Sequence, residues 1–111
     1  MADFELKKFK NNKMDSVINN TDELQFEFES DGLKAYLTYR FYKRDIAFMH
    51  TFVPKQLEGR GIATQLAKAA FAYAKEIKRK VMVYCPFVSR FIKKHSEYNT
   101  QLDPEYHSTK Q

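Results

Sequence analysis

Apolar and polar residues alternate along the first half of the chain. Leu24, Phe26 and Phe28 are each separated by one polar residue, and this period of two predicts a half-buried β-strand. Residues 30–32, Ser-Asp-Gly, then predict a hairpin turn, because Gly takes positive φ without steric cost and Asp tolerates turn geometry. A second strand follows over residues 33–42.

A third strand is predicted from the next β-rich run, residues 46–53, which Pro54 ends. Residues 42–45 supply the reversal before it, so the three strands form an antiparallel meander. At the N-terminus, residues 4–9 are compatible with a short strand. Residues 10–20 are polar and rich in Asn, and they indicate a loop.

After the third strand the period of the apolar residues changes from two to 3.6, which predicts an amphipathic helix of about 18 residues. Its apolar face comprises Ile62, Leu66, Ala69, Tyr73 and Ile77. A β-branched run at residues 81–84 predicts another strand, and Pro86 opens a second, shorter helix. The tail from Asn99 is polar, and we expect it to be frayed.

This order of elements predicts an α/β fold with a mixed sheet: an antiparallel meander, then a parallel β-α-β unit, then a short C-terminal helix. A strand–helix–strand crossover makes the strands that end at Val53 and near Cys85 parallel, normally with a right-handed connection. Their C-terminal ends then lie at one edge of the sheet, where ligands usually bind in such units. With 111 residues, the chain is expected to form one domain, residues 1–111.

Composition agrees with a folded protein, because 43% of the residues are hydrophobic and 30% are charged. The net charge of +5 attracts polyanions of any kind, but the Lys and Arg residues are scattered, which is typical of a solvated surface. A single Cys forms no internal disulfide, and no apolar run is long enough for a signal peptide or a membrane span. We therefore expect a cytoplasmic protein without membrane contact, as a monomer or weak dimer.

The loop at residues 56–61, Gln-Leu-Glu-Gly-Arg-Gly, joins a predicted strand to the long helix and holds two of the three glycines in the chain. Glycine lets the backbone turn tightly and approach a ligand, so that N–H groups and the helix N-terminus face an anion. This arrangement suits a pyrophosphate. Arg60 and Lys55 can add charge-assisted contacts to the same phosphates.

Two other phosphate-binding loops do not fit these residues. A Walker A loop requires Lys and Ser or Thr after its last glycine, but Ile62 and Ala63 follow Gly61. The dinucleotide fingerprint requires Gly or Ala where Thr64 stands, and it requires an acidic residue near positions 79–83, where none occurs.

The pattern Gln-x-x-Gly-x-Gly at residues 56–61 resembles the coenzyme A pyrophosphate loop of the GCN5-related N-acetyltransferase (GNAT) superfamily. The resemblance extends to His-Thr-Phe-Val-Pro at residues 50–54, Cys-Pro-Phe-Val at residues 85–88 and His-Ser-Glu-Tyr at residues 95–98. Together these segments are similar to the small GNAT-like family described as N-acetyltransferase domain-containing proteins, over about residues 17–98.

This resemblance implies that acetyl-coenzyme A is the co-substrate and that an amine of unknown identity accepts the acetyl group. The residues implied in coenzyme A binding are Phe52, Val53, Gln56, Glu58, Gly59, Arg60, Gly61, Ile62 and Ala63. The chain departs from the family pattern at Ala63, where the family often has Gly, and at Ser96, where Pro is usual. Neither change removes a phosphate-binding N–H group.

Two residues are candidates for catalysis. Cys85 directly precedes the second predicted helix, whose N-terminus favours a thiolate, although a lone Cys is usually a small buried hydrophobe. His50 shares a predicted strand face with Phe48 and Phe52, so that a core imidazole is the alternative to a functional one. The resemblance implies an active-site role for both, with His50 acting as a base for the amine or as a partner of the thiol.

The remaining candidates have structural interpretations. Tyr84 is expected on the opposite face from Cys85, and His95 and Tyr98 are expected to pack or to cap. No spacing of His, Cys or carboxylate residues predicts a metal site. Larger enzymes of the GNAT superfamily wall the acceptor site with extra helices near the N-terminus, whereas this chain goes almost directly into the meander, so the resemblance implies an open, shallow acceptor groove.

Two rival functions differ in what they require. A coenzyme A-binding module without chemistry needs the glycine loop but neither of the two catalytic candidates. A small basic nucleic-acid-binding domain that stacks bases on Tyr and Phe leaves the glycine loop unexplained. We therefore expect no nucleic-acid partner.

Overall fold

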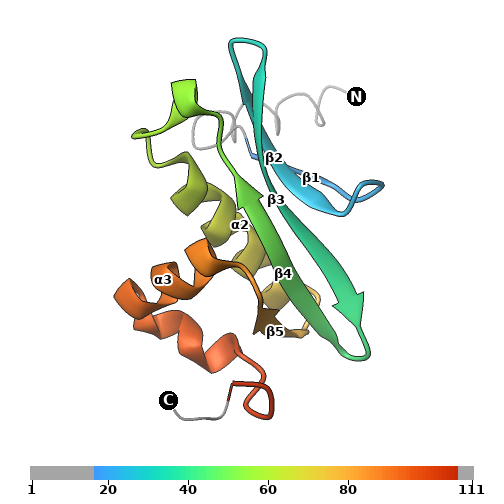
Figure 1. Ribbon diagram of the computed structural model, residues 1–111. Helices are drawn as coiled ribbons and strands as arrows, with labels where there is room; N and C mark the ends of the chain where they lie inside the picture. Colours follow the sequence, from blue (N-terminus) through green and yellow to red (C-terminus); the bar gives the residue numbers. More distant parts are fainter. Residues whose placement is uncertain (1–16, 108–111) are drawn as a thin grey trace.

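The computed structural model describes residues 17–107 (Figure 1). Its strands are β1 (Ile18–Asn20), β2 (Gln25–Ser30), β3 (Leu33–Tyr42), β4 (Asp45–Phe52) and β5 (Lys80–Val83). Its helices are α2 (Ile62–Glu76) and α3 (Pro86–Lys94), with short 3₁₀ helices at Lys55–Leu57 and Ser96–Gln101. The strand predicted at residues 4–9 lies outside the described residues.

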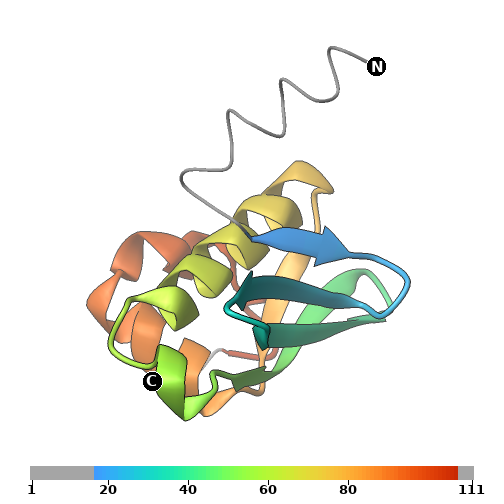
Figure 2. The ribbon, with the colours of Figure 1, turned by 90° about the horizontal axis from the view of Figure 1, so that it is seen from above.

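The five strands form one sheet in the order β1-β2-β3-β4-β5. Neighbouring strands from β1 to β4 are antiparallel, whereas β4 and β5 are parallel and are joined through α2. Helices α2 and α3 lie on the same side of the sheet (Figure 2). The predicted α/β fold, with a meander followed by a β-α-β unit and a short helix, is confirmed.

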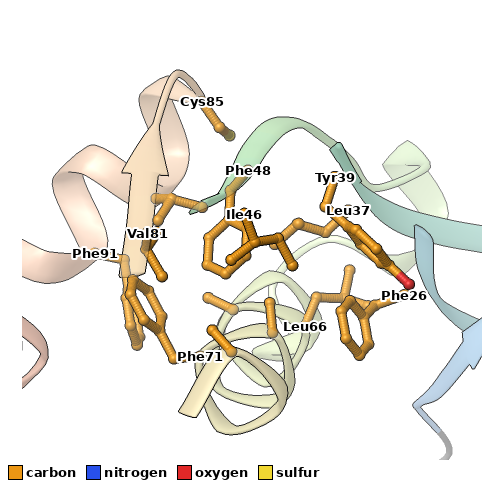
Figure 3. Packing of buried hydrophobic residues seen from close by; sticks show 14 of the residues in the cluster. Phe26, Leu37, Tyr39, Ile46, Phe48, Leu66, Phe71, Val81, Cys85 and Phe91 are labelled. Carbon is orange, nitrogen blue, oxygen red and sulfur yellow. The ribbon is translucent and has the colours of Figure 1, made fainter. Parts of the chain in front are cut away.

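Aromatic rings fill the space between the sheet and the helices (Figure 3). Phe71 of α2 packs edge-on against Phe48 of β4, with 5.1 Å between ring centroids, and lies 4.7 Å from the ring of Tyr98. On the other side of α2, Tyr73 packs against Tyr39 of β3. Because these side chains come from four different segments, the ring cluster fixes how the helices sit on the sheet.

The buried stripe of α2 differs from the predicted one. The helix has 15 residues rather than about 18, and its buried residues are Ile62, Leu66, Ala67, Ala70, Phe71 and Ala74. The predicted face residues Ala69, Tyr73 and Ile77 are half-buried. Three alanines on the buried stripe let the helix backbone approach the sheet closely, and this packing decides the orientation of the helix.

The prediction of a loop over residues 10–20 is wrong for its last part. Residues Ile18–Asn20 form β1, which pairs with β2. Its sequence lacks the apolar alternation that reveals a strand. Its one large apolar side chain, Ile18, is exposed. Backbone pairing holds the strand instead, assisted by a 2.7 Å hydrogen bond that the Tyr39 hydroxyl donates to Asn19 Oδ1.

The prediction of a frayed C-terminal tail is also wrong for the described residues. Leu102 pairs with Val81 of β5 in a parallel bridge, and the Asp103 N–H donates to the Val81 carbonyl at 3.0 Å. The Val83 N–H donates to Nε2 of His107 at 3.0 Å. Burial lowers the pKa of His107, which favours the neutral imidazole that this bond requires. The polar tail therefore covers the free edge of β5.

Neither helix of the described residues is long and apolar enough to cross a membrane.

The contact between β4 and the tail predicts a pH dependence of stability. Burial, together with the hydrogen bond to Asp103, raises the pKa of Asp45 from 3.8 to about 6. The folded state then holds a proton that the unfolded chain has lost, so this contribution to stability is lost as pH rises from about 4 to about 6. Asp45→Asn keeps a donor to Asp103 and should remove this slope, raising stability above about pH 6 by roughly 1 kcal/mol.

Urea unfolding at about pH 4.5 and about pH 7.5 measures the effect. Asp22→Asn, at an exposed turn position, is the control and should leave the slope unchanged. If the stability of Asp45→Asn depends on pH as steeply as that of the wild type, the dependence does not come from the proton that Asp45 holds next to Asp103.

Candidate functional site

The glycine loop is anchored in the core at both ends. Leu57 is 1% exposed and Ile62 is 3% exposed, so each side chain fixes one end of the loop. A 3₁₀ turn precedes the glycines, in which the Leu57 N–H donates to the Pro54 carbonyl at 2.9 Å and the Glu58 N–H donates to the Lys55 carbonyl at 3.1 Å. The loop therefore has a defined conformation.

The two glycines of this loop both require a left-handed backbone. Gly59 has a φ of +83° and Gly61 a φ of +75°, a region that side chains with a Cβ rarely adopt. A Cβ at either position would meet no protein atom within 4 Å. The backbone is strained for any other residue, and the space in front of it is open to a ligand.

The N-terminus of α2 presents donors without internal partners. Gly61 is its cap residue, no side chain caps the helix, and no acidic residue lies in its first turn. The first N–H groups of a helix have no carbonyl partner inside it, and the helix dipole makes this end positive. Arg60 directly precedes the cap residue and is exposed, as is Lys55 in the 3₁₀ turn before the glycines. An anion at the helix N-terminus would meet backbone donors.

The other predicted loop residues fall into two groups. Gln56 and Glu58 are exposed. Ile62 is buried and Ala63 is half-buried, so their contribution to a ligand in front of the loop would come from backbone N–H groups.

Strands β4 and β5 separate before β4 reaches the glycine loop. Their parallel pairing ends with Phe48 opposite Val83, and the Tyr84 N–H makes the last link, to the Phe48 carbonyl at 3.0 Å. β4 continues to Phe52 without β5 beside it (Figure 1). Within residues 17–107 no strand pairs with this side of β4 beyond Phe48, so an extended ligand would find backbone groups there.

A β-bulge at Met49 reverses the faces of β4. Thr38 pairs with His50, but the next residue of β3, Tyr39, pairs with Phe48, so Met49 has no partner. An extra residue in one strand moves every following side chain to the opposite face. The prediction that His50 shares a face with Phe48 is therefore wrong, because strict alternation does not allow for the extra residue.

Cys85 lies at the end of β5, at the margin of the core cluster (Figure 3). It is the cap residue of α3, with Pro86 in the first turn, as predicted. The side chain is 2% exposed, and its Sγ lies 3.2 Å from Oγ1 of Thr51 on β4. The sequence pattern did not single out Thr51, because only the bulge turns it toward the helices and the thiol.

His50 lies on the opposite face of β4 from Thr51. It is exposed rather than part of the core, and its ring centroid lies 6.3 Å from that of Tyr36. Phe52, which is 44% exposed, lies 5.4 Å from the same Tyr36 ring. No helix of the described residues covers this face. His50 and Cys85 thus flank the parting of the strands from opposite sides and are not in contact.

Each of the residues expected to be structural lies against another aromatic ring. Tyr84 is exposed and its ring lies 5.3 Å from that of Tyr106, whereas Tyr98 and His95 pack against Phe91 at 5.3 and 4.5 Å. In the part of the chain that the structure describes, no group of three or more His, Cys, Asp or Glu residues is arranged to hold a metal ion.

Comparisons with known proteins agree with this geometry. The chain is 36% identical to Protein NATD1 of Bos taurus over 85 residues, covering 72% of this chain and 75% of that protein. It is 34% identical to Protein NATD1 of Mus musculus over 93 residues, covering 79% of this chain and 84% of that protein.

The fold has a solved counterpart as well. The solution structure of a GCN5-like candidate N-acetyltransferase from Staphylococcus aureus matches with a TM-score of 0.62 and 28% identity, covering 84% of this chain and 95% of that one. The family model described as GCN5-related N-acetyl-transferase matches residues 25–102, which include β2 to β5, both helices and the glycine loop. The chain therefore belongs to the GCN5-related N-acetyltransferase family.

Proposed function

We propose that this protein transfers the acetyl group of acetyl-coenzyme A to a primary amine. One observation carries the proposal: the parting of β4 and β5 opens toward the same sheet edge as the glycine loop and the N-terminus of α2. A thioester with a long pantetheine arm and a pyrophosphate needs such a combination, because its reacting carbonyl and its phosphates must be held in one pose.

The loop supplies the phosphate contacts in this proposal. The backbone N–H groups from Gly59 to Ala63 donate to the phosphates, next to glycines whose Cβ would meet no protein atom within 4 Å, and Arg60 supplies a guanidinium that can donate two parallel hydrogen bonds. Gln56 and Glu58 are exposed on the same loop and border the pyrophosphate position. The fit is supported by the absence of any acidic side chain in the first turn of α2.

Backbone groups of β4 hold the acyl end. Beyond Phe48 the strand edge is not paired with β5, and Phe52 and Val53 lie nearest to the loop. A peptide N–H on this edge can donate to the thioester carbonyl and stabilise the negative charge that develops on its oxygen. When bound, acetyl-coenzyme A supplies the activated carbonyl.

His50 accepts a proton from the acceptor amine. It is exposed on the helix-free face of the sheet, where an incoming amine has access. The lone pair of the neutral amine forms the new N–C bond as the C–S bond breaks, and His50 takes the proton that the nitrogen loses to become an amide, which it later releases to solvent. The half-buried ring of Tyr36 and the exposed ring of Phe52 border the same route.

Cys85 donates the proton that the departing sulfur requires. Its thiol lies at the inner side of the parting, and it is almost wholly buried. A buried thiol can pass a proton along a short contact, whereas a nucleophilic role would require the acetyl carbon to reach the sulfur itself. These positions favour a general acid over a transient acetyl acceptor.

The acceptor is the unknown partner in this reaction. A panel of protein, peptide and small-molecule amines, screened for free thiol release from acetyl-coenzyme A, identifies it. Saturable binding of acetyl-coenzyme A without turnover of any amine would favour the non-catalytic binding module. We further propose that the protein acts in the cytoplasm as a monomer or weak dimer, which cell fractionation and sedimentation test.

Acetyl-coenzyme A should raise the melting temperature in a concentration-dependent way, because a ligand that binds only the folded state stabilises it. Gly59→Val and Gly61→Val should abolish this shift, since a β-branched side chain opposes positive φ and blocks approach to the backbone. Gly32→Val is the matched control: its φ is +76° and its Cβ would also meet nothing within 4 Å, but it lies in the β2–β3 turn.

Melting temperatures measured with and without millimolar acetyl-coenzyme A compare the three variants with the wild type. All three variants should lose stability, and only Gly32→Val should keep the ligand shift. The proposed loop is wrong if the two loop variants bind as the wild type does.

Arg60→Ala should weaken acetyl-coenzyme A binding by about 1–3 kcal/mol, because charge-assisted contacts to phosphate are lost. Isothermal titration measures the loss, with Arg40→Ala, an exposed position on β3, as the control. An equal loss with dephospho-coenzyme A places the contact at the pyrophosphate. A loss confined to the full cofactor would move it to the 3′-phosphate, and no loss would remove Arg60 from the site.

The two catalytic candidates have separable kinetic signatures. Cys85→Ala should lower kcat by roughly 10²-fold, while Cys85→Ser, which keeps a proton donor, retains an appreciable rate. His50→Ala should lower kcat by a similar factor, and affinity for acetyl-coenzyme A should change little in all three variants.

Mass spectrometry during turnover adds the decisive control. An acetyl adduct on Cys85, with Cys85→Ser nearly inactive, would replace the acid role by a nucleophilic one. Wild-type rates in both Cys85→Ala and His50→Ala would leave the chemistry to backbone donors and water.

A further inference from the structure

We propose that Thr51 is a positioning residue that orients the Cys85 thiol and stabilises the sulfur after its proton has left. The inference rests on the proposed function of Cys85. It starts from the 3.2 Å contact between Thr51 Oγ1 and Cys85 Sγ, which joins residues 34 positions apart in the sequence.

The bulge in β4 creates this contact. Thr51 pairs with Leu37, which is completely buried on the side of the sheet that the helices cover. Without the unpaired Met49, strict alternation would turn Thr51 to the opposite face, where His50 lies. The bulge therefore exchanges the two side chains and delivers the hydroxyl to the thiol.

Both groups in the contact are held firmly. The Ser89 N–H donates to the Cys85 carbonyl at 3.0 Å in the first turn of α3, which fixes the cysteine backbone. Thr51 is β-branched, so that its χ1 angle has few accessible values, and it is half-buried on a paired strand. Among the described residues, Thr51 is the one side chain that forms a hydrogen bond with the Cys85 sulfur.

A hydroxyl can serve both states of the sulfur. It accepts from the S–H group while Cys85 is a thiol, and after rotation it donates to the thiolate. In the proposed step the S–H bond of Cys85 breaks, its proton joins the departing coenzyme A sulfur, and the electron pair stays on Sγ. A donor 3.2 Å away lowers the energy of this thiolate, and solvent protons restore the thiol after product release.

Kinetics of matched variants test the role. Thr51→Val removes the hydroxyl at nearly constant volume and should lower kcat about tenfold, with the KM for acetyl-coenzyme A changed less than twofold. Thr51→Ser restores the hydroxyl and should recover most of the rate. Thr100→Val, at an exposed position beyond α3, is the control and should keep the wild-type rate. Equal kcat values in Thr51→Val and the wild type would overturn the proposal.

A second readout does not depend on turnover. Cys85 is the single cysteine of the chain, so the chemical shift of its ¹³Cβ reports the surroundings of this sulfur alone. Thr51→Val should change this chemical shift, because the sulfur loses its hydrogen-bond partner, and Thr51→Ser should restore it. An unchanged chemical shift in Thr51→Val would overturn the proposal.

The two readouts separate the possible failures. If no amine is acetylated while the chemical shift still changes in Thr51→Val, the proposed reaction is wrong and the Thr51–Cys85 coupling stands. If the wild type turns over an amine while kcat and the chemical shift are the same in Thr51→Val, the reaction stands and Thr51 is structural.

Discussion

The parting of β4 from β5 is the constraint on which the site depends. Parallel strands pair through regularly spaced hydrogen bonds, and here the ladder ends with the link from the Tyr84 N–H to the Phe48 carbonyl. One residue later, the unpaired Met49 changes the direction of the β4 side chains. The same few residues thus provide an unpaired backbone edge and decide which side chains border it.

The fold follows from the sequence wherever a periodic pattern is strong. Alternation through Phe26 and Phe28, the turn at Gly32 and the helical period after Pro54 are local signals, and the structure realises each of them. The edge strand β1 and the ordered tail are held by backbone pairing to distant residues. Such pairing leaves no hydrophobic period to detect, which is why neither was predictable.

The sequence names candidate site residues, but it does not give their geometry. The loop glycines can be recognised from the sequence, since only Gly adopts their backbone angles at low cost. The faces of His50 and Thr51 depend on a bulge that no residue type announces, and strict alternation inverts both. A motif can name candidate residues, but a single extra residue in a strand decides which of them meet.

Coverage of β5 by the tail has a consequence for association between molecules. β5 is the last strand of the sheet, and an uncovered edge strand offers unpaired N–H and C=O groups to another chain. Here Leu102 pairs with Val81, and the His107 ring accepts the Val83 N–H. The polar C-terminal segment therefore protects this edge against edge-to-edge aggregation, and a chain shortened before Leu102 would expose the edge of β5 to pairing with another molecule.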